Sequence, residues 1–409
     1  MRIDYKLQDK FDLWLFVPAI LLIAIGLVAI YSSTINHPEV HNNFQRQLTW
    51  GIISLIIFFI TYSLPTNSFK FLGVPAYFIS ILLLLVVLVV GRKVSGARSW
   101  LYFGGIGFQP SEFAKIATIL AISSFLSRTN SNIESIKDIG IALVIGFLPV
   151  GLILLEPDMG TSLTFMSLIL ILLFWKGISL FGLFVVLSPG LVAISSLFGT
   201  YYFIASLILV LGALLVFQKD IITSGSIVAL NLGAGFFTEI VFRALSLHQQ
   251  KRIQSFIDPS ADPLGAGYNA IQAKVAIGSG GLFGKGFLAG NQTQLQFIPE
   301  QWTDFIFCVI GEEFGFIGSI VVLALFMSVI LRILKIATSA KDEFLSLVSI
   351  GILAIYFVHL VINIGMVVGI MPIIGIPLPF VSYGGSSLVV NMFLLGIIAN
   401  IYRTRKNYT

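Results

Sequence analysis

Apolar runs long enough to cross a bilayer dominate this chain of 409 residues. A hydrocarbon core about 30 Å thick requires roughly 20 apolar residues in a helix. Twelve runs of about that length fall at 13–33, 48–64, 71–91, 112–127, 139–155, 161–176, 180–197, 201–217, 222–244, 304–334, 343–369 and 384–402. Only 11% of the residues are charged, against about 25% in soluble domains. We therefore predict an all-α, polytopic transmembrane helical bundle of about 10–12 spans.

The hydrophilic parts of the chain define its organisation. The first apolar run is longer than the core of a secretory signal, and no cleavage motif follows it, so we interpret it as a retained helix. The only large hydrophilic segment is 246–303. It contains the amphipathic piece "YNAIQAKVAIG", which predicts a partly helical extracytoplasmic loop. We expect residues 1–409 to form a single integral membrane domain that contains this loop.

The basic residues are distributed unevenly. With the N-terminus in the cytoplasm, the predicted inner segments hold only a mild excess of lysine and arginine. Clusters fall on the predicted outer side instead, near 92–115 and 243–285. They suggest an anionic ligand there; the alternative is that long loops cross the membrane regardless of charge. The net charge of +5 gives no reason to expect a nucleic acid partner.

Four acids interrupt the apolar stretch "IPEQWTDFIFCVIGEE" at 298–313. An ionised carboxylate in hydrocarbon is costly, so such residues are candidates for function. Glu300 and Asp304 share one helix face at the outer mouth of a span, where partial desolvation suits a general base. Alternatively, acids at a helix N-terminus favour its dipole. That alternative explains Glu300 and Asp304, but not the deeper pair Glu312 and Glu313.

Two further motifs place charge at span ends. In "FQPSEFAK", Glu112 and Lys115 are three residues apart and share a helix face. Lys115 neutralises either Glu112, as a packing ion pair, or a carboxylate on another helix. In "LLEPDMGTSL", Glu156 and Asp158 flank a proline at an outer helix end. They are either site residues or solvated acids.

A proline-rich loop lies between the last two apolar runs. "MPIIGIPLPFVSYGGSS" at 371–387 predicts non-helical backbone, which membrane proteins tolerate where it is buried in protein or lines a wet cavity. We expect a cavity wall with Ser382, Tyr383 and Ser386 as hydrogen-bonding side chains.

Other polar motifs are less specific. "GSGGLFGKG" lacks the Ser or Thr that a nucleotide-binding loop requires after Lys285. It is either a glycine-rich phosphate contact with Lys285 or a flexible turn. His359 and Asn363 are four residues apart, which predicts interhelical hydrogen bonds. The sequence shows no Cys/His cluster with metal-ligand spacing, so we assign no metal ligands.

Five motifs, taken in order, resemble the SEDS family (shape, elongation, division and sporulation proteins). They are "GARSWLYFGGIGFQPSEFAK", "LLEPDMGTSL", "QQKRIQSFIDPSADPLGAGYNAIQAKVAIGSGGLFGKG", "FIPEQWTDFIFCVIGEEFGFIG" and "NIGMVVGIMPIIGIPLPFVSYGGSS". The resemblance implies a glycosyltransferase that polymerises lipid II into peptidoglycan strands outside the cytoplasmic (inner) membrane. It implies that Asp304 is the catalytic acid/base, that Glu112 and Lys115 line its cavity, and that Lys115 is the partner of Asp304. Arg98 and Trp100 match the outer-loop motif of the family.

The proline loop is more similar to the RodA (elongation) branch than to the FtsW (division) branch, which typically carries a lysine where Ile374 stands. Family members usually have ten spans, whereas 177–250 is longer here and suggests two more. The resemblance also implies a class B penicillin-binding protein and other elongation-complex membrane proteins as partners.

The implied reaction is an inverting transfer with Asp304 as general base. Its leaving group is a lipid pyrophosphate, which positive charge would stabilise. The candidate cations are Arg98, Lys115, Lys274 and Lys285, and a divalent cation, Mg²⁺ or Mn²⁺, is a candidate to share that task. Two other functions stay open: a lipid II flippase or transporter, and a non-catalytic scaffold for a transpeptidase.

Overall fold

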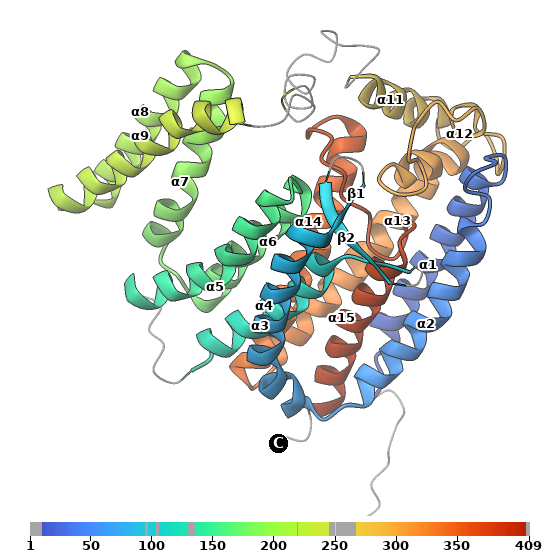
Figure 1. The fold of residues 1–409 in the computed structure, drawn as a ribbon, viewed down its shortest axis with the longest axis horizontal. Helices are drawn as coiled ribbons and strands as arrows, with labels where there is room; N and C mark the ends of the chain where they lie inside the picture. The colour runs from blue at the N-terminus through green and yellow to red at the C-terminus, as the bar shows by residue number, and fades with distance from the viewer. Residues whose placement is uncertain are drawn as a thin grey trace, which may run out of the picture. The chain divides into compact units, whose positions relative to one another are not determined.

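The computed structural model describes residues 10–94, 97–103, 106–128, 136–218, 220–244, 250 and 267–405. Its first helices and strands are α1 (Leu13–Thr34), α2 (Asn43–Ser63), α3 (Thr66–Val90), β1 (Arg92–Val94), β2 (Ala97–Phe103), β3 (Ile106–Phe108), α4 (Pro110–Leu126), α5 (Ile136–Leu155) and α6 (Met159–Lys176). They are followed by α7 (Leu180–Leu197), α8 (Thr200–Phe217), α9 (Ile221–Ala244), α11 (Tyr268–Gly280), α12 (Asn291–Gln294), α13 (Ile306–Ser339), α14 (Glu343–Val368) and α15 (Gly385–Thr404) (Figure 1).

The predicted transmembrane bundle is confirmed. Within the described ranges, eleven helices are long and apolar enough to cross a membrane. The twelfth predicted run corresponds to α4, which is only 17 residues long. Each of the twelve predicted runs therefore coincides with a helix.

The chain divides into two compact units. The main unit comprises 1–176 and 269–409, and the three-helix unit comprises 177–268. The single integral membrane domain expected from the sequence stays a prediction. Of the predicted outer loop at 246–303, residues 246–249 and 251–266 lie outside the described residues, and the rest contains α11 and α12. The helix predicted for "YNAIQAKVAIG" is confirmed as α11.

Helix α14 forms the core of the main unit. It packs against α13, α6 and α4, while α15 packs against α2. Most of its residues are buried, from Phe344 near its start to Val367 near its end. Since other helices cover most of α14, the polar side chains on it need hydrogen-bond partners within the protein.

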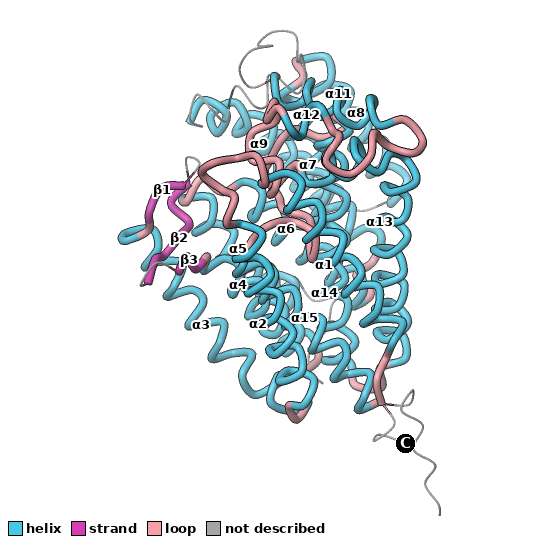
Figure 2. Tube along the Cα trace, turned by 90° about the vertical axis from the view of Figure 1, so that its right-hand side faces the viewer, coloured by secondary structure: helices cyan, strands magenta, loops and turns pink. Residues whose placement is uncertain are grey.

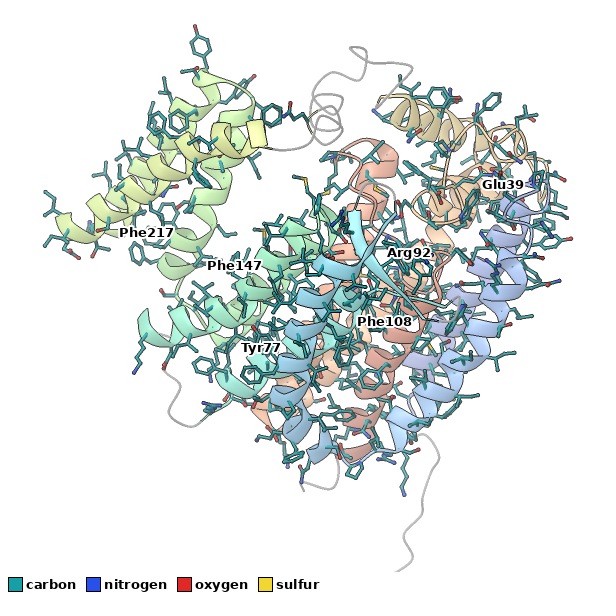
Figure 3. All side chains as sticks on the ribbon, viewed as in Figure 1. Glu39, Tyr77, Arg92, Phe108, Phe147 and Phe217 are labelled. Carbon is teal, nitrogen blue, oxygen red and sulfur yellow. The ribbon has the colours of Figure 1, made fainter. Side chains whose placement is uncertain are left out.

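A hydrogen bond between α3 and α5 compensates for a proline. Pro149 lies inside α5 and has no N–H, so the carbonyl of Ile145, four residues earlier, loses its usual helical donor. Tyr77 of α3 lies toward α5 (Figure 3), and its hydroxyl donates to Ile145 O at 2.7 Å. In a membrane-spanning helix such a freed carbonyl requires a replacement donor.

A small antiparallel sheet connects α3 to α4. Its strand order is β1-β2-β3 (Figure 2), with Arg92 opposite Trp100 and Leu101 opposite Phe108. The sequence analysis did not predict these strands. Two of them are only three residues long, too short for a clear alternating pattern. The sheet ends at Phe108, and after Gln109 the helix α4 begins at Pro110.

The three-helix unit has a core of its own. Val192 of α7, Val210 and Leu214 of α8 and Ile227 of α9 form its buried cluster. Asn231 of α9 donates to Ser188 Oγ of α7 at 3.0 Å. The unit therefore consists of three apolar helices joined by packing and at least one polar contact.

Candidate active site

Helix α13 is broken near the predicted site, and the glycine-rich segment fills the break. Gly315 has a φ of 65° and a ψ of −159°, which is not helical. Four backbone hydrogen bonds close the break: Lys285 N to Glu312 O at 3.0 Å, Gly286 N to Glu313 O at 3.0 Å, Phe316 N to Gly281 O at 2.9 Å and Ile317 N to Leu282 O at 3.2 Å. We call residues 281–286 the glycine clasp. Two of its N–H groups are thus bonded to helix carbonyls, which hold the segment in place; a phosphate contact with Lys285 stays a prediction.

The two deep acids fasten the segment that follows the clasp. Glu312 is buried and accepts four hydrogen bonds, from Lys285 Nζ at 2.8 Å, Gln292 N at 2.9 Å, Thr293 N at 2.9 Å and Thr293 Oγ1 at 2.8 Å. Glu313 accepts from Ser32 of α1 and from Gln294. The cost of burying these carboxylates is offset by hydrogen bonds. Their position deep in an apolar helix is therefore explained by attachment of the outer segment.

Asp304 lies just before α13, in a segment held by backbone hydrogen bonds. Three consecutive carbonyls accept hydrogen bonds: Trp302 O from Tyr383 N at 2.9 Å, Thr303 O from Ser382 Oγ at 2.6 Å and Asp304 O from Asn363 Nδ2 at 2.8 Å. Ser382 and Tyr383 are therefore hydrogen-bonded to the two residues that precede Asp304; their role in a cavity wall stays a prediction. Ser386, the third predicted hydrogen-bonding residue, is partly buried in the first turn of α15.

The Asp304 carboxylate rests against the proline loop. Gly375 has a φ of +79°, and a Cβ at that position would lie 3.0 Å from Asp304 Oδ2. Asp304 is partly buried. A glycine at this position allows the carboxylate to approach the loop backbone closely.

The proline loop is held by side chains of α14. Asn363 Nδ2 also donates to Ile376 O at 2.7 Å, and His359 Nδ1 lies 3.1 Å from Pro377 O. These contacts satisfy non-helical carbonyls, which is how such backbone is tolerated within a membrane bundle. On the other side, a Cβ on Gly160 of α6 would lie 2.8 Å from Ile376 Cγ1, so α6 packs closely on the loop.

Lys115 forms an ion pair within its own helix. Its Nζ lies 2.7 Å from Glu112 Oε1 and 3.5 Å from His359 Nε2, and both charged side chains are buried. The ion pair is the packing alternative considered from sequence. His359 links it to the proline loop, so Lys115 is connected to the Asp304 region through α14. Direct pairing of Lys115 with Asp304 stays a prediction.

Glu156 and Asp158 have different environments at the turn between α5 and α6. Asp158 caps α6 by accepting from Thr161 N at 3.0 Å and from Thr161 Oγ1 at 2.8 Å. Glu156 is fully buried, and burial, together with the nearby Asp158 charge, raises its pKa to about 8. Its carbonyl accepts from Arg98 N at 3.3 Å. Neither acid is simply solvated.

The remaining predicted residues lie at the rim. Arg98 has an exposed side chain on β2, and a Cβ on Gly107 would lie 3.1 Å from the Trp100 ring. Lys274 of α11 crosses the end of α14: a Cβ on Gly369 would lie 2.4 Å from Lys274 Nζ. Desolvation raises the pKa of Glu300, and interaction with His37 lowers it in part. In the described parts of the chain, no three His, Cys, Asp or Glu side chains are arranged to hold a metal ion.

Sequence reasoning did not place three polar residues at this site. His359 and Asn363 were expected only to make interhelical hydrogen bonds. Gln47 of α2 was not considered, yet its side chain donates to Ser382 O at 3.3 Å and accepts from Gly384 N at 3.1 Å. The available signal was a polar side chain inside an apolar helix.

Comparison with known proteins decides the family. A family model described as "Cell cycle protein", which covers FtsW, RodA and SpoVE, matches residues 12–206 and 181–407. The chain belongs to the FtsW/RodA/SpoVE family. This membership and the apolar helices make it a multi-pass membrane protein.

Family relatives match over nearly the whole chain. Peptidoglycan glycosyltransferase MrdB of Escherichia coli K12 is 37% identical over 392 residues, covering 95% of this chain and 94% of the relative. Peptidoglycan glycosyltransferase RodA of Treponema pallidum is 34% identical, covering 96% of this chain and 98% of the relative. Stage V sporulation protein E of Bacillus subtilis is 33% identical over 96% of this chain and 97% of its own.

Solved structures of the family share the fold. One, described as showing the structural coordination of polymerization and crosslinking by a peptidoglycan synthase complex, has a TM-score of 0.75 and 28% identity, covering 97% of this chain and 98% of its own. The crystal structure of RodA from Thermus thermophilus has a TM-score of 0.65 and 26% identity, covering 97% of each chain. The two stretches matched by the FtsW/RodA/SpoVE family model overlap at 181–206, which lies in the three-helix unit.

Proposed function

We propose that this chain is a peptidoglycan glycosyltransferase that polymerises lipid II at the outer face of the cytoplasmic membrane during cell elongation. Two relatives that match it over nearly its whole length bear the name peptidoglycan glycosyltransferase. The observation that carries the proposal is the setting of Asp304. Its carboxylate lies where a membrane helix begins, and hydrogen bonds hold the backbone of its segment.

Asp304 acts as the general base. The sugar hydroxyl of the acceptor gives its proton to the Asp304 carboxylate as its oxygen forms a bond to the anomeric carbon of the donor. The bond between that carbon and the diphosphate oxygen breaks, and the lipid diphosphate leaves with inversion. The lipid tails of both substrates stay in the bilayer, so a base at the end of a membrane helix lies at the depth of the reacting sugars.

Of the three candidate lysines, Lys274 is the best placed to stabilise the leaving diphosphate. Lys115 and Lys285 already pair with Glu112 and Glu312 at 2.7 and 2.8 Å. Among the described residues, no carboxylate forms an ion pair with Lys274, and its ammonium lies over Gly369, where the loop that carries Gly375 begins. A cation is also favoured at the end of α14 by the helix dipole.

A divalent cation would be held mainly by the substrate. The described side chains offer no cluster of three suitable ligands, whereas diphosphate oxygens bind Mg²⁺ or Mn²⁺ well. We therefore propose no metal ligand among the described residues.

The partner follows from the same relatives. One similar structure belongs to a synthase complex that coordinates polymerization with crosslinking. We therefore propose that a class B penicillin-binding protein binds this chain and crosslinks its product.

Asp304→Asn tests the function. The amide keeps the size of the carboxylate but cannot accept the proton, so we expect a loss of at least about 100-fold in polymer formed from purified lipid II. Asp342→Asn is the matched control: Asp342 caps α14 through Phe344 N at 2.9 Å, a role that asparagine also fulfils. Near-normal polymer from folded Asp304→Asn would overturn the proposal. Transport of labelled lipid II across vesicles without polymer would identify a flippase instead.

A further inference from the structure

Asn363 connects the two segments that form the predicted base site. It is fully buried in α14. Its single amide nitrogen donates to Asp304 O at 2.8 Å and to Ile376 O at 2.7 Å. A carboxamide has two N–H groups in one plane, so both of its donors are used to fix these two carbonyls relative to each other.

The distance between the Asp304 segment and the proline loop determines where the Asp304 carboxylate lies. Ile376 directly follows Gly375. A Cβ on Gly375 would lie only 3.0 Å from Asp304 Oδ2. Moving the backbone of Asp304 away from the loop would therefore move the carboxylate away from Gly375.

The support behind Asn363 is rigid. His359 lies one turn earlier on the same face of α14 and contacts Pro377 O at 3.1 Å. Most of α14 is buried among other helices. The two side chains thus hold consecutive loop carbonyls from a helix that packing keeps in place.

We propose that Asn363 is a positioning residue for the transfer reaction, which acts through the backbone of Asp304 to hold the carboxylate against the proline loop. This inference rests on the proposed function. Asn363 touches neither sugar nor diphosphate in this role. A displacement of the base by about 1 Å is expected to lower the rate by about 100-fold.

Substitution of Asn363, compared with a second buried asparagine, tests the proposal. Asn400 is also fully buried and lies near the C-terminal end of α15. It donates to Leu64 O at 2.7 Å and to Tyr62 O at 2.9 Å. In Asn363→Ala, which removes both donors, we expect kcat to fall by about 100-fold while KM for lipid II changes little. Asn400→Ala removes more hydrogen bonds than Asn363→Ala, since Asn400 also donates to Thr61 O at 3.3 Å and accepts from Thr66 Oγ1 at 3.1 Å, but it should keep most of kcat.

A glycine pair gives an independent test should Asn363→Ala not fold. Gly375 and Gly177 both have a left-handed φ, of +79° and +99°, but a Cβ on Gly177 would meet no atom within 4 Å. Gly375→Ala displaces the Asp304 carboxylate and should lower kcat strongly, whereas Gly177→Ala carries only the backbone strain. The proposal is overturned if folded Asn363→Ala keeps its kcat, if Asn400→Ala loses as much, or if the two glycine variants behave alike. Such results leave the proposed function intact as long as Asp304→Asn makes no polymer.

Discussion

The protonation of a buried acid at the end of a predicted span depends on its local environment. Glu156 and Asp158 are two residues apart, yet Asp158 caps a helix and Glu156 is fully buried. Burial and the Asp158 charge raise the pKa of Glu156 from its ordinary 4.5 to about 8. The folded protein therefore favours the protonated form of this side chain.

Glu156→Gln should change the pH dependence of stability. Between pH 4.5 and about 8 the folded state binds more protons than the unfolded state at this group, so wild-type stability falls as pH rises. Glutamine mimics the protonated acid and removes that dependence. Thermal unfolding in detergent should show that the free energy of unfolding of the variant rises relative to that of the wild type as pH rises, by an amount on the order of a few kcal/mol near pH 8. Parallel stability curves for the two proteins would contradict this assignment.

Some candidate site residues could be predicted from the sequence, whereas the partners of others could not. Asp304 and Ser382 were identified because acids and hydroxyls beside apolar runs are conspicuous, and the structure brings their segments together. The partners of Asn363 and Glu312 could not be predicted. Asn363 bonds to carbonyls 59 and 13 residues away, and backbone carbonyls carry no sequence signal.

At the scale of elements, the helices were predictable and their interruptions were not. Length and apolar composition alone locate a spanning helix, which is why all twelve runs coincide with helices. The break at Gly315 depends on pairing with the glycine clasp, about 30 residues earlier in the chain. The short sheet before α4 depends on pairing between strands, and neither kind of pairing is visible in a local pattern.

Gly315→Ala should destabilise the protein through the clasp. Its φ and ψ belong to a region that only glycine adopts readily, and an added Cβ would lie 2.3 Å from Gly284 N. We expect the free energy of unfolding to fall by about 2 kcal/mol or more. The matched control is Gly278→Ala in α11, where a Cβ would meet nothing within 4 Å and alanine favours the helix. Equal thermal stability of the two variants would exclude the clasp as a stabilising element.

At the scale of the whole molecule, the candidate site and the longer middle region belong to different compact units. Every predicted site residue lies in the main unit. The two stretches matched by the family model overlap at 181–206, within the three-helix unit. This overlap agrees with an interruption of the family pattern there, as the length of 177–250 suggested. A pair of added spans leaves the orientation of all later spans unchanged, whereas one added span would invert them.

Deletion of 200–244, which removes α8 and α9, should therefore keep polymerisation of lipid II. The deletion removes two spans, so α13, α14 and α15 keep their orientation and the site stays on its original side. Deletion of 200–217, which removes α8 alone, is the control: it changes the number of spans by one, reverses the later helices and should abolish polymer formation. The measurement is glycan made by each purified variant, with accessibility of a tag at the C-terminus reporting orientation. An inactive two-span deletion that is folded and correctly oriented would show that the three-helix unit contributes to the reaction itself.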